Sequence, residues 1–462
     1  MNNFTESQEE AYNRLVSGKN LFLTGAAGTG KSYIIAQFRD FCAKSNITVG
    51  VTSSTGVSAL LIDGTTIHSF TGIALGLEDA EVIAQRLLKS KFYKWRYICL
   101  KVLIIDEISM ISGELFTKLD SIFKKVRENE LPFGGVQLVI TGDFLQLPPV
   151  NTKSKEYDFA FYSPSWKQCF PGKCNNMVLH ENVRQFSDVV FQKILTEVRI
   201  GSVSDSTFEE LEKRINVNVS KNGISPTQLF GKRSDVDKIN QESLRKLLSG
   251  GVDKEKFTSS TRVTYVSATQ NQSARNRKIP KALHDRLISK LVKTCPASTD
   301  LVLCVGAQVM LLHNLDIKRQ LVNGSRGIVI SFESVLDEDQ NEIGRLPKVR
   351  FISGVEETIA LHSWTMKEEC ANSQTLQQQK KDYHIASYTQ IPLGLAYATT
   401  IHKSQGGTLD CASMQLNDMF EYGQLYTALS RVKSLECLSI TSIDRKGIKA
   451  HPDVLRFYST LL

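Results

Sequence analysis

Short apolar runs alternate with helical patterns through roughly the first 200 residues of the chain. Four of these runs have the length and composition of buried strands, at 21–24, 49–53, 102–105 and 136–141. Strands that alternate with helices along a sequence form parallel sheets built from βαβ units. The pattern therefore predicts an α/β domain with a parallel sheet in this part of the chain.

The pattern changes further along. A second α/β region begins near Gly201, with a helical pattern over 235–248 and a strand-like run over 261–268. From Gly306 to about Ile391, short alternating runs are separated by turn dipeptides such as Asn-Gly, which is typical of a small antiparallel barrel. Because α/β character returns afterwards, we expect the barrel to be an insertion within a second lobe.

Length and composition agree with two lobes in an intracellular enzyme. At 462 residues the chain is too long for one ordinary core, and 41% hydrophobic with 23% charged residues is a globular composition. No apolar run approaches the ~20 residues that span a bilayer, and the start, MNNFTESQEE, has no signal-peptide pattern. Nine cysteines without a CxxC pair predict reduced thiols, with neither a disulfide framework nor a zinc site. The compartment stays open: nucleus or mitochondrion, bacterial cytoplasm, or an infected host cell.

The charge balance is basic. The chain has 56 Lys and Arg against 48 Asp and Glu, a net charge of +8, which suits a polyanionic partner without requiring one. The densest basic stretch, 273–293, has helical spacing in its second half. A solvated helix face is therefore favoured there over a track for DNA.

The stretch LFLTGAAGTGKSYII, Leu21 to Ile35, carries the first chemistry. Gly25 and Gly30 bracket a GxxxxGK[ST] pattern at a predicted strand-to-helix turn. Glycine tolerates the positive φ angles that turn backbone N–H groups onto a triphosphate, and the following helix N-terminus favours negative charge. In this pattern Lys31 reaches the β- and γ-phosphates and the Ser32 hydroxyl ligates Mg²⁺.

Two further segments complete a candidate phosphoryl-transfer site. In KVLIIDEISM, a run of four aliphatic residues delivers Asp106 and Glu107 to the carboxyl end of a strand, where open α/β sheets bind ligands. Asp106 is suited to hold Mg²⁺ through water, and Glu107 to act as general base. Gln146 follows the next predicted strand and is placed to sense the γ-phosphate. Arg184 and Arg431 are candidates for stabilising charge on the transferred phosphoryl group, although each alone could form a surface salt bridge.

The ordered set of motifs resembles the PIF-type (petite integration frequency) DNA helicases of superfamily 1B. The matching stretches are ESQEEAY, GAAGTGKS, TSSTGVSALLIDGTTIHSF, IIDEISMISGELFTKLD, GDFLQLPPV, NVRQ, GAQVMLLHNLD, LVNGSRG, TIHKSQGGTLD and GQLYTALSRV. FTKLDSIFKKVRENELPFGGVQLVITGD is close to the signature that separates PIF-type enzymes from RecD-like relatives. The chain departs from the family pattern at Tyr397, Gly407 and Cys437, where tryptophan, methionine and glycine are usual.

The resemblance implies ATP and Mg²⁺ as cofactors and gives roles to single residues. Gln8 reads the adenine, and Ser32 and Asp106 hold the metal. Glu107 is the general base, and Gln146 senses the γ-phosphate. Arg184 and Arg431 are the arginine fingers. The residues implied in catalysis are Lys31, Asp106, Glu107, Gln146, Arg184 and Arg431. The residues implied in nucleotide binding are Gln8, Gly25, Ala26, Ala27, Gly28, Thr29, Gly30, Lys31, Ser32, Arg184 and Arg431.

The resemblance also implies contacts to a single DNA strand. The matching positions are Thr55, Gly56, His68, Phe70, His402, Lys403 and Ser404. Phe70 offers a stacking platform, worth ~1–3 kcal/mol per base, but it could instead belong to the core, and His68 could be a structural histidine. Trp95 could separate strands, yet it leads directly into the strand before Asp106, so we expect it in the core.

The implied fold class is α/β, with two RecA-like parallel-sheet P-loop lobes, a small wedge insertion in lobe 1 and a β-barrel insertion in lobe 2. The expected bounds are 1–70 with 95–200 for lobe 1, 71–94 for the wedge, 201–305 with 392–462 for lobe 2, and 306–391 for the barrel.

The implied activity is ATP-dependent 5′→3′ unwinding of DNA in replication, repair, recombination or telomere maintenance. The expected partners are single-stranded DNA, forked or tailed duplexes, G-quadruplexes and RNA–DNA hybrids, bound by a monomer without a membrane. No residue pattern derives the direction of travel. An alternative is a translocase that displaces proteins without unwinding, and a nuclease partner supplied by another chain stays open. A non-enzymatic scaffold is disfavoured because the catalytic set is complete.

Overall fold

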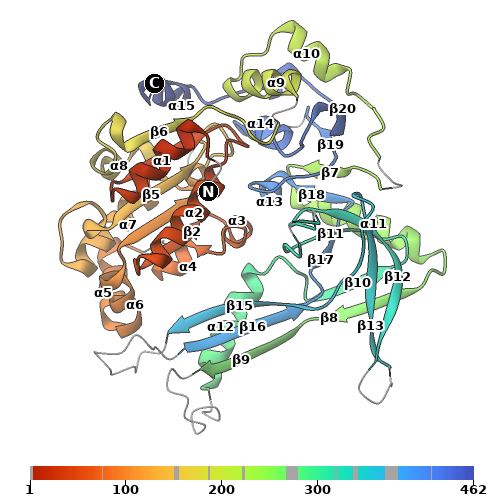
Figure 1. Cartoon of the computed structure of the whole chain (residues 1–462), viewed down its shortest axis with the longest axis horizontal. Coiled ribbons are helices and arrows are strands. Elements are labelled where there is room, and N and C mark those ends of the chain that lie inside the picture. Colours follow the sequence, from red (N-terminus) through yellow and green to blue (C-terminus); the bar gives the residue numbers. More distant parts are fainter. Residues whose placement is uncertain are drawn as a thin grey trace. The chain divides into compact units, whose positions relative to one another are not determined.

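The computed structural model describes residues 4–74, 76, 78–149, 156–185, 188–220, 224–266, 279–316, 318–319, 321–336, 342–369, 383–417 and 419–461. The chain divides into two compact units (Figure 1). Unit 1 comprises 1–217, 401–407 and 414–462, and unit 2 comprises 218–400 and 408–413. The lobe bounds expected from the sequence stay a prediction.

Unit 1 is built on a six-stranded sheet in which every neighbouring pair is parallel. Its strands, in the order β3-β2-β4-β5-β1-β6, are β3 (Thr65–Thr66), β2 (Val49–Ser53), β4 (Val102–Asp106), β5 (Gln137–Gly142), β1 (Leu21–Gly25) and β6 (Asn176–Leu179). The four strands predicted from apolar runs are confirmed, each within one residue at either end. Two strands of the predicted set, β1 and β4, are buried along their whole length, which explains their continuous apolar sequence.

Helices and short 3₁₀ turns connect these strands. Those of unit 1 are α1 (Glu6–Val16), α2 (Lys31–Lys44), α3 (Gly56–Leu61), α4 (Ile67–Thr71), α5 (Ala80–Lys89), α6 (Lys91–Cys99), η1 (Ile108–Met110), α7 (Gly113–Arg127), η2 (Pro132–Gly135), η3 (Ala160–Tyr162), α8 (Pro164–Cys169), η4 (Lys173–Asn175), α9 (Val189–Ile200), α10 (Asp205–Glu212), α13 (Ile401–Ser404), α14 (Gln424–Leu429), η6 (Leu435–Cys437), η7 (Arg445–Gly447) and α15 (Pro452–Leu461). Unit 1 also contains β20 (Leu438–Ser442), and β19 (Ala412–Gln415) is divided between the units.

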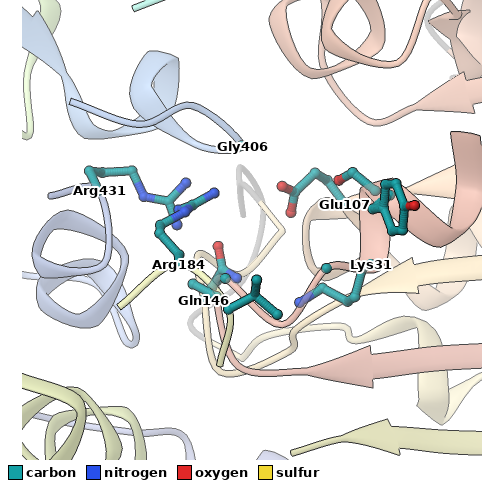
Figure 2. A pocket seen from close by; sticks show the side chains of 12 residues that line it. Lys31, Glu107, Gln146, Arg184, Gly406 and Arg431 are labelled. Carbon is teal, nitrogen blue, oxygen red and sulfur yellow. The ribbon is translucent and has the colours of Figure 1, made fainter. Parts of the chain in front are cut away.

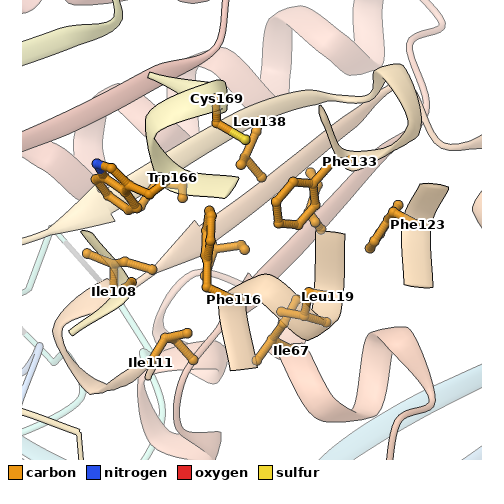
Figure 3. Close-up of a cluster of buried hydrophobic side chains, with 14 of the residues drawn as sticks. Ile67, Ile108, Ile111, Phe116, Leu119, Phe123, Phe133, Leu138, Trp166 and Cys169 are labelled. Carbon is orange, nitrogen blue, oxygen red and sulfur yellow. The ribbon is translucent and has the colours of Figure 1, made fainter. Parts of the chain in front are cut away.

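The largest hydrophobic cluster of unit 1 packs α7 against the sheet (Figure 3). Its centre is aromatic: the ring centroids of Phe116 and Phe133 are 5.1 Å apart, and those of Phe116 and Trp166 are 5.5 Å apart. Phe133 has a φ of 48°, an uncommon conformation for a side chain of this size. The buried carboxylate of Asp120 accepts a hydrogen bond from the Phe133 backbone nitrogen at 2.7 Å, which holds this turn in place. The family signature segment is thus a packing unit of α7 and η2.

Among the described residues, the strands of unit 2 pair mainly in antiparallel fashion, and long helices accompany them. Its strands are β7 (Thr227–Phe230), β8 (Lys254–Thr258), β9 (Ser260–Val266), β10 (Asp300–Cys304), β11 (Gln308–Leu311), β12 (Arg326–Leu336), β13 (Glu342–Phe351), β14 (Glu356–Thr358), β15 (His362–Glu369), β16 (Tyr383–Gln390), β17 (Leu393–Leu395) and β18 (Ala398–Thr400). Its helices are α11 (Arg233–Leu248) and α12 (Lys281–Thr294). β7 and β18 pair in parallel.

The antiparallel strands expected between Gly306 and Ile391 are confirmed, and they are distributed over two sheets. One sheet has the order β14-β13-β12-β11-β17, and the other has the order β15-β16-β9. The second sheet therefore recruits β9 from before the expected insertion. The helical half of the basic stretch 273–293 is α12, while 273–278 lies outside the described residues.

The prediction that Trp95 belongs to the core is wrong, because its side chain is 47% exposed. The reason lies in the phase of α6. This helix buries Tyr97, whose hydroxyl donates to the Thr71 carbonyl oxygen at 2.9 Å. Side chains two positions apart on a helix point about 200° away from each other. Because Tyr97 points into the core, Trp95 points outward. Within the described ranges, no helix is both long enough and apolar enough to cross a membrane.

Candidate functional site

The loop between β1 and α2 has the backbone geometry that its glycines predict. Gly28 and Gly30 have φ angles of 87° and 85°, in the region that favours glycine. A Cβ at Gly28 would lie 2.7 Å from Cβ of Arg184, so this position also requires close approach of two segments. Gly30 directly precedes α2, which directs the N-terminus of that helix toward the loop.

The Lys31 ammonium folds back over the loop. Its Nζ donates to the carbonyl oxygens of Gly25 at 2.8 Å and Ala26 at 2.9 Å. Burial lowers the pKa of Lys31, and the nearby carboxylates of Asp143 and Glu107 oppose that effect. The loop therefore holds a desolvated cation where a phosphate would bind.

Gln8 closes one side of the loop. This residue is 4% exposed, and its Nε2 donates to the Thr29 carbonyl oxygen at 3.2 Å. Its Oε1 accepts from the backbone nitrogen of Thr5, as part of the capping box that begins α1. A Cβ at Gly30 would meet Gln8 Nε2 at 2.5 Å. The structure thus brings Gln8 to the glycine-rich loop, and its role in reading the adenine stays a prediction.

Asp106 and Glu107 end β4 beside this loop. Asp106 is 7% exposed, and its Oδ1 accepts hydrogen bonds from the Glu107 backbone nitrogen and from the Thr141 hydroxyl. Glu107 has a φ of 55°, a left-handed conformation for a residue other than glycine, which turns its side chain away from the strand direction. Burial, together with the charge on Asp106, raises the pKa of Glu107 to about 7. Such a carboxyl is suited to accept a proton near neutral pH.

A pocket of about 280 Å³ lies over the loop (Figure 2). It is lined by Ala27, Gly28, Gly30, Lys31, Ser32, Tyr33, Glu107, Gln146, Val183, Arg184, Gly406 and Arg431. Lys31 and Glu107 lie on one side of it, and the two arginines lie on the other. Gln146 is 5% exposed, and its Oε1 has no hydrogen-bond partner among the residues that the structure describes. All six residues predicted to be catalytic therefore come together here, with Asp106 directly beside the lining.

The two arginines lie close to each other, and Arg431 is buried whereas Arg184 is partly buried. Arg184 Nη1 donates to the Ser430 carbonyl oxygen at 3.2 Å. Arg431 is 2% exposed and donates to the carbonyl oxygens of Thr427, Ser404 and Gly407 and to the Ser430 hydroxyl. Burial, reinforced by the charge on Arg184, lowers the pKa of Arg431 to about 10. Two desolvated cations facing one pocket attract an anion with several charges.

The structure adds residues that sequence reasoning missed. The Tyr426 hydroxyl accepts a hydrogen bond from the Ala27 backbone nitrogen at 2.8 Å. Gln405 Nε2 donates to Glu107 Oε2 at 3.0 Å. Behind the loop, Asp143 forms a buried bidentate ion pair with Arg199 at 2.8 and 2.9 Å. Tyr426, Gln405 and Asp143 lie within quoted motifs, but no motif spacing reveals which partner each of them meets.

The residues predicted to contact DNA in the N-terminal part lie around α3 and α4. Thr55 caps α3, since its Oγ1 accepts from the Ser58 backbone nitrogen at 3.2 Å, and Gly56 is the first residue of that helix. His68 is partly buried, and burial lowers its pKa. The edge of the Phe70 ring lies against Gly50, where a Cβ would be 2.4 Å from Phe70 Cζ.

Phe70 is further restricted by Arg96, whose guanidinium lies 5.0 Å from the ring centroid.

The other predicted DNA contacts lie in the segment 401–407. Lys403 is exposed and His402 is partly buried. Ser404 is buried, and its hydroxyl donates to the Ile401 carbonyl oxygen at 2.8 Å. The DNA contacts of all seven positions stay a prediction.

Two family models match the chain. "PIF1-like helicase" matches residues 3–209, and "DNA helicase Pif1, 2B domain" matches residues 287–332. The ATP-dependent DNA helicase PIF1 of Xenopus laevis is 38% identical over 452 residues, which are 98% of this chain and 63% of that protein. The chain thus spans less than two thirds of this curated relative.

Solved structures match over nearly the whole chain. The crystal structure of the Pif1 helicase from Candida albicans has a TM-score of 0.75 and 33% identity, and the match covers 100% of both chains. The Pif1 helicase from Bacteroides in complex with ADP-AlF3 and ssDNA has a TM-score of 0.60 and 28% identity, covering 98% of this chain and 96% of that one. With these similarities and the pocket geometry, the chain belongs to the PIF1-like helicase family.

Proposed function

We propose that this chain is an ATP-dependent DNA helicase that moves 5′→3′ along single-stranded DNA and unwinds duplex or structured DNA. One observation carries the proposal: the loop lysine, the carboxyl of Glu107, the amide of Gln146 and the guanidinium groups of two arginines converge on one pocket in unit 1. This set suits hydrolysis of a nucleoside triphosphate. The Bacteroides relative was solved in complex with both ADP-AlF3 and ssDNA, which supports binding of a nucleotide together with a single strand.

In the proposed reaction, the loop amides and Lys31 hold the β- and γ-phosphates. The Lys31 ammonium gives up its hydrogen bonds to two carbonyl oxygens and donates to phosphate oxygens instead. The phosphate supplies a negative charge next to this desolvated cation. Glu107 takes a proton from the attacking water, and the free Oε1 of Gln146 orients that water or the γ-phosphate. Arg184 and Arg431 stabilise the charge that develops on the transferred group.

The residues present fit Mg²⁺. Ser32 lines the pocket with a hydroxyl at the start of α2, and Asp106 offers a carboxylate that two hydrogen-bond donors fix in place. Such oxygen ligands, completed by water and phosphate oxygens, are the usual surroundings of this ion. When bound, Mg²⁺ neutralises charge on the β- and γ-phosphate oxygens.

The proposed DNA partner is a single strand with a duplex or folded structure ahead of it. The net charge of +8 supports binding of a polyanion. Forked and tailed duplexes, RNA–DNA hybrids and G-quadruplexes are the proposed substrates, in DNA replication, repair or recombination, with a monomer as the working form.

The test is displacement of a labelled strand from duplexes that carry either a 5′ or a 3′ single-stranded tail, with ATP and Mg²⁺. We expect displacement from the 5′-tailed duplex only. Lys31→Ala should abolish displacement and hydrolysis while single-strand binding stays. Lys44→Ala is the matched control, since Lys44 is exposed at the far end of the same helix.

The alternative function is a translocase that clears proteins from single strands. It predicts ATP consumption on single strands and release of a bound protein block, with neither duplex opened. Displacement from the 3′-tailed duplex alone would contradict the proposed direction, and ATP hydrolysis retained in Lys31→Ala would contradict the assignment of the site.

A further inference from the structure

The turn that carries Gln146 is held together by the residue that follows β5. The Gln146 backbone nitrogen donates to the Asp143 carbonyl oxygen at 2.9 Å, and the Leu145 backbone nitrogen donates to Asp143 Oδ1 at 3.1 Å. Gln146 lines the pocket, and its buried Oε1 accepts no hydrogen bond from any residue that the structure describes. Because no described residue fixes that end of the amide, the geometry of the turn decides where it points.

The C-terminal helix, α15, supports the same turn from behind. Tyr458 is 8% exposed, and its hydroxyl oxygen lies 2.9 Å from Asp143 Oδ1, 3.2 Å from the Phe144 backbone nitrogen and 2.6 Å from Thr24 Oγ1. Thr24 directly precedes Gly25, where the glycine-rich loop begins. One oxygen atom therefore joins the turn of Gln146 to the strand that leads into the phosphate-binding loop.

The direction of each hydrogen bond to this hydroxyl follows from the chemistry of its partners. Burial opposes ionisation of Asp143, but the charge and hydrogen bonds of Arg199 outweigh burial and lower the pKa of this carboxyl. A carboxylate can only accept, so the single phenolic proton of Tyr458 faces Asp143. The Thr24 hydroxyl and the Phe144 N–H then donate to the two lone pairs of the phenolic oxygen. Loss of this one hydroxyl therefore breaks three contacts at once.

Aromatic packing holds α15 in place independently of the hydroxyl. The Phe457 ring stacks on that of Phe161 with centroids 4.4 Å apart, and its centroid lies 5.7 Å from that of Phe144. The Arg199 guanidinium lies 5.0 Å from the centroid of the Tyr458 ring. Since these contacts involve rings alone, we expect α15 to keep its position in Tyr458→Phe.

We infer that Tyr458 is a positioning residue for ATP hydrolysis, which acts through Gln146. Its hydroxyl fixes the turn 143–146 against the end of β1, and so holds the Gln146 amide where the γ-phosphate and the attacking water meet. Tyr458 itself is not among the residues that line the pocket in the described part of the chain. The inference rests on the proposed function, because it requires that the chain hydrolyse ATP.

The first experiment compares ATP hydrolysis by the unmodified chain and by Tyr458→Phe, with saturating oligo-dT and Mg²⁺. The variant keeps the ring and removes only the hydroxyl. We expect kcat to fall on the order of tenfold, because a misplaced polar group slows the reaction. The KM for ATP and the affinity for a fluorescent ADP analogue should stay within about twofold.

A double-mutant cycle with Gln146→Ala distinguishes positioning from general damage to the fold. Gln146→Ala removes the amide on which Tyr458 acts. In that background, Tyr458→Phe should therefore change the rate of hydrolysis by less than about twofold. The four proteins of the cycle are compared under single-turnover conditions, with protein in excess over ATP, so that slow variants also give a rate constant.

Two further variants complete the test. Thr24→Val keeps the shape of a buried side chain and removes one donor to the Tyr458 hydroxyl, so kcat should fall less than in Tyr458→Phe. It takes the place of Tyr458→Phe in the cycle if that variant does not fold. Tyr388→Phe is the matched control, because Tyr388 is 0% exposed and its hydroxyl donates to the Ala297 carbonyl oxygen at 3.2 Å, in unit 2. It should retain the kcat of the unmodified chain.

The outcomes separate the inference from the proposed function. If the unmodified chain hydrolyses no ATP, the proposed function fails. If it does, full kcat in Tyr458→Phe, or in Thr24→Val in its place, overturns the inference. Equal falls with and without the Gln146 amide also overturn it, because the effect then does not pass through Gln146. Loss of ADP affinity with kcat unchanged, or an equal fall of kcat in Tyr388→Phe, overturns it as well.

Discussion

The hydroxyl of Tyr426 lies 2.8 Å from the backbone nitrogen of Ala27 and accepts its hydrogen bond. The two residues are 399 positions apart in sequence. Tyr426 is on α14, five residues before Arg431, so one short segment both holds the nucleotide loop and supplies a cation to the pocket.

Tyr426→Phe should lower the free energy of unfolding by about 1–3 kcal/mol, because the buried Ala27 N–H loses its acceptor. Urea unfolding measures the change. Tyr162→Phe is the control, because Tyr162 is 42% exposed, and its loss should cost about 0.5 kcal/mol or less. Equal stability of both variants would contradict a role for the hydroxyl in holding the loop.

Arg431→Ala should lower kcat for ATP hydrolysis by ~10³-fold, as expected for an arginine that stabilises the transferred phosphoryl group. Nucleotide affinity, measured by titration, should change far less. Arg431→Lys should restore little, because one ammonium cannot reproduce the fork of hydrogen bonds to Thr427, Ser404 and Ser430. A fall in affinity alone, with kcat intact, would indicate a ground-state contact instead.

Asp143→Ala should lower the free energy of unfolding by about 3–5 kcal/mol, since it leaves Arg199 as a largely buried cation without its ion-pair partner. The Asp143 side chain is 0% exposed and that of Arg199 17%. Glu78→Ala removes an ion pair to Arg86 in which both side chains are more than 40% exposed, and should cost about 1 kcal/mol or less. Denaturant titration of both variants measures the two losses in the free energy of unfolding. Losses of similar size would contradict this prediction.

His362 should make the chain less stable as the pH falls from about 6.5 toward 4. Burial, followed by the neighbouring His313 ring with its centroid 3.9 Å away, lowers the pKa of His362 to about 4. The unfolded chain therefore binds a proton that the folded chain does not, and stability is lost as the pH falls through this window. In His362→Gln, the unfolding midpoint should depend less on pH over the same range. An unchanged pH dependence would contradict this assignment.

The sequence was most informative where function depends on local backbone. Gly30, Lys31 and Asp106 lie in short motifs whose strand and helix boundaries follow from apolar runs, and the structure has Gly30 and Lys31 at the start of α2 and Asp106 at the end of β4. Gln405 is 298 positions from Glu107, and only the tertiary fold brings them together. Trp95 was misplaced because the burial preference of its residue type was considered without the phase of its helix.

The pocket draws on both ends of unit 1 in sequence: the loop lies within the first 32 residues, while Gly406 and Arg431 come after residue 400. Because a ribosome makes the N-terminal part first, a growing chain has its phosphate-binding loop long before its arginine and Gln405 exist. A nascent or prematurely terminated chain therefore contains the loop but lacks the two lining residues from beyond position 400, so the pocket is complete only when the chain is nearly finished.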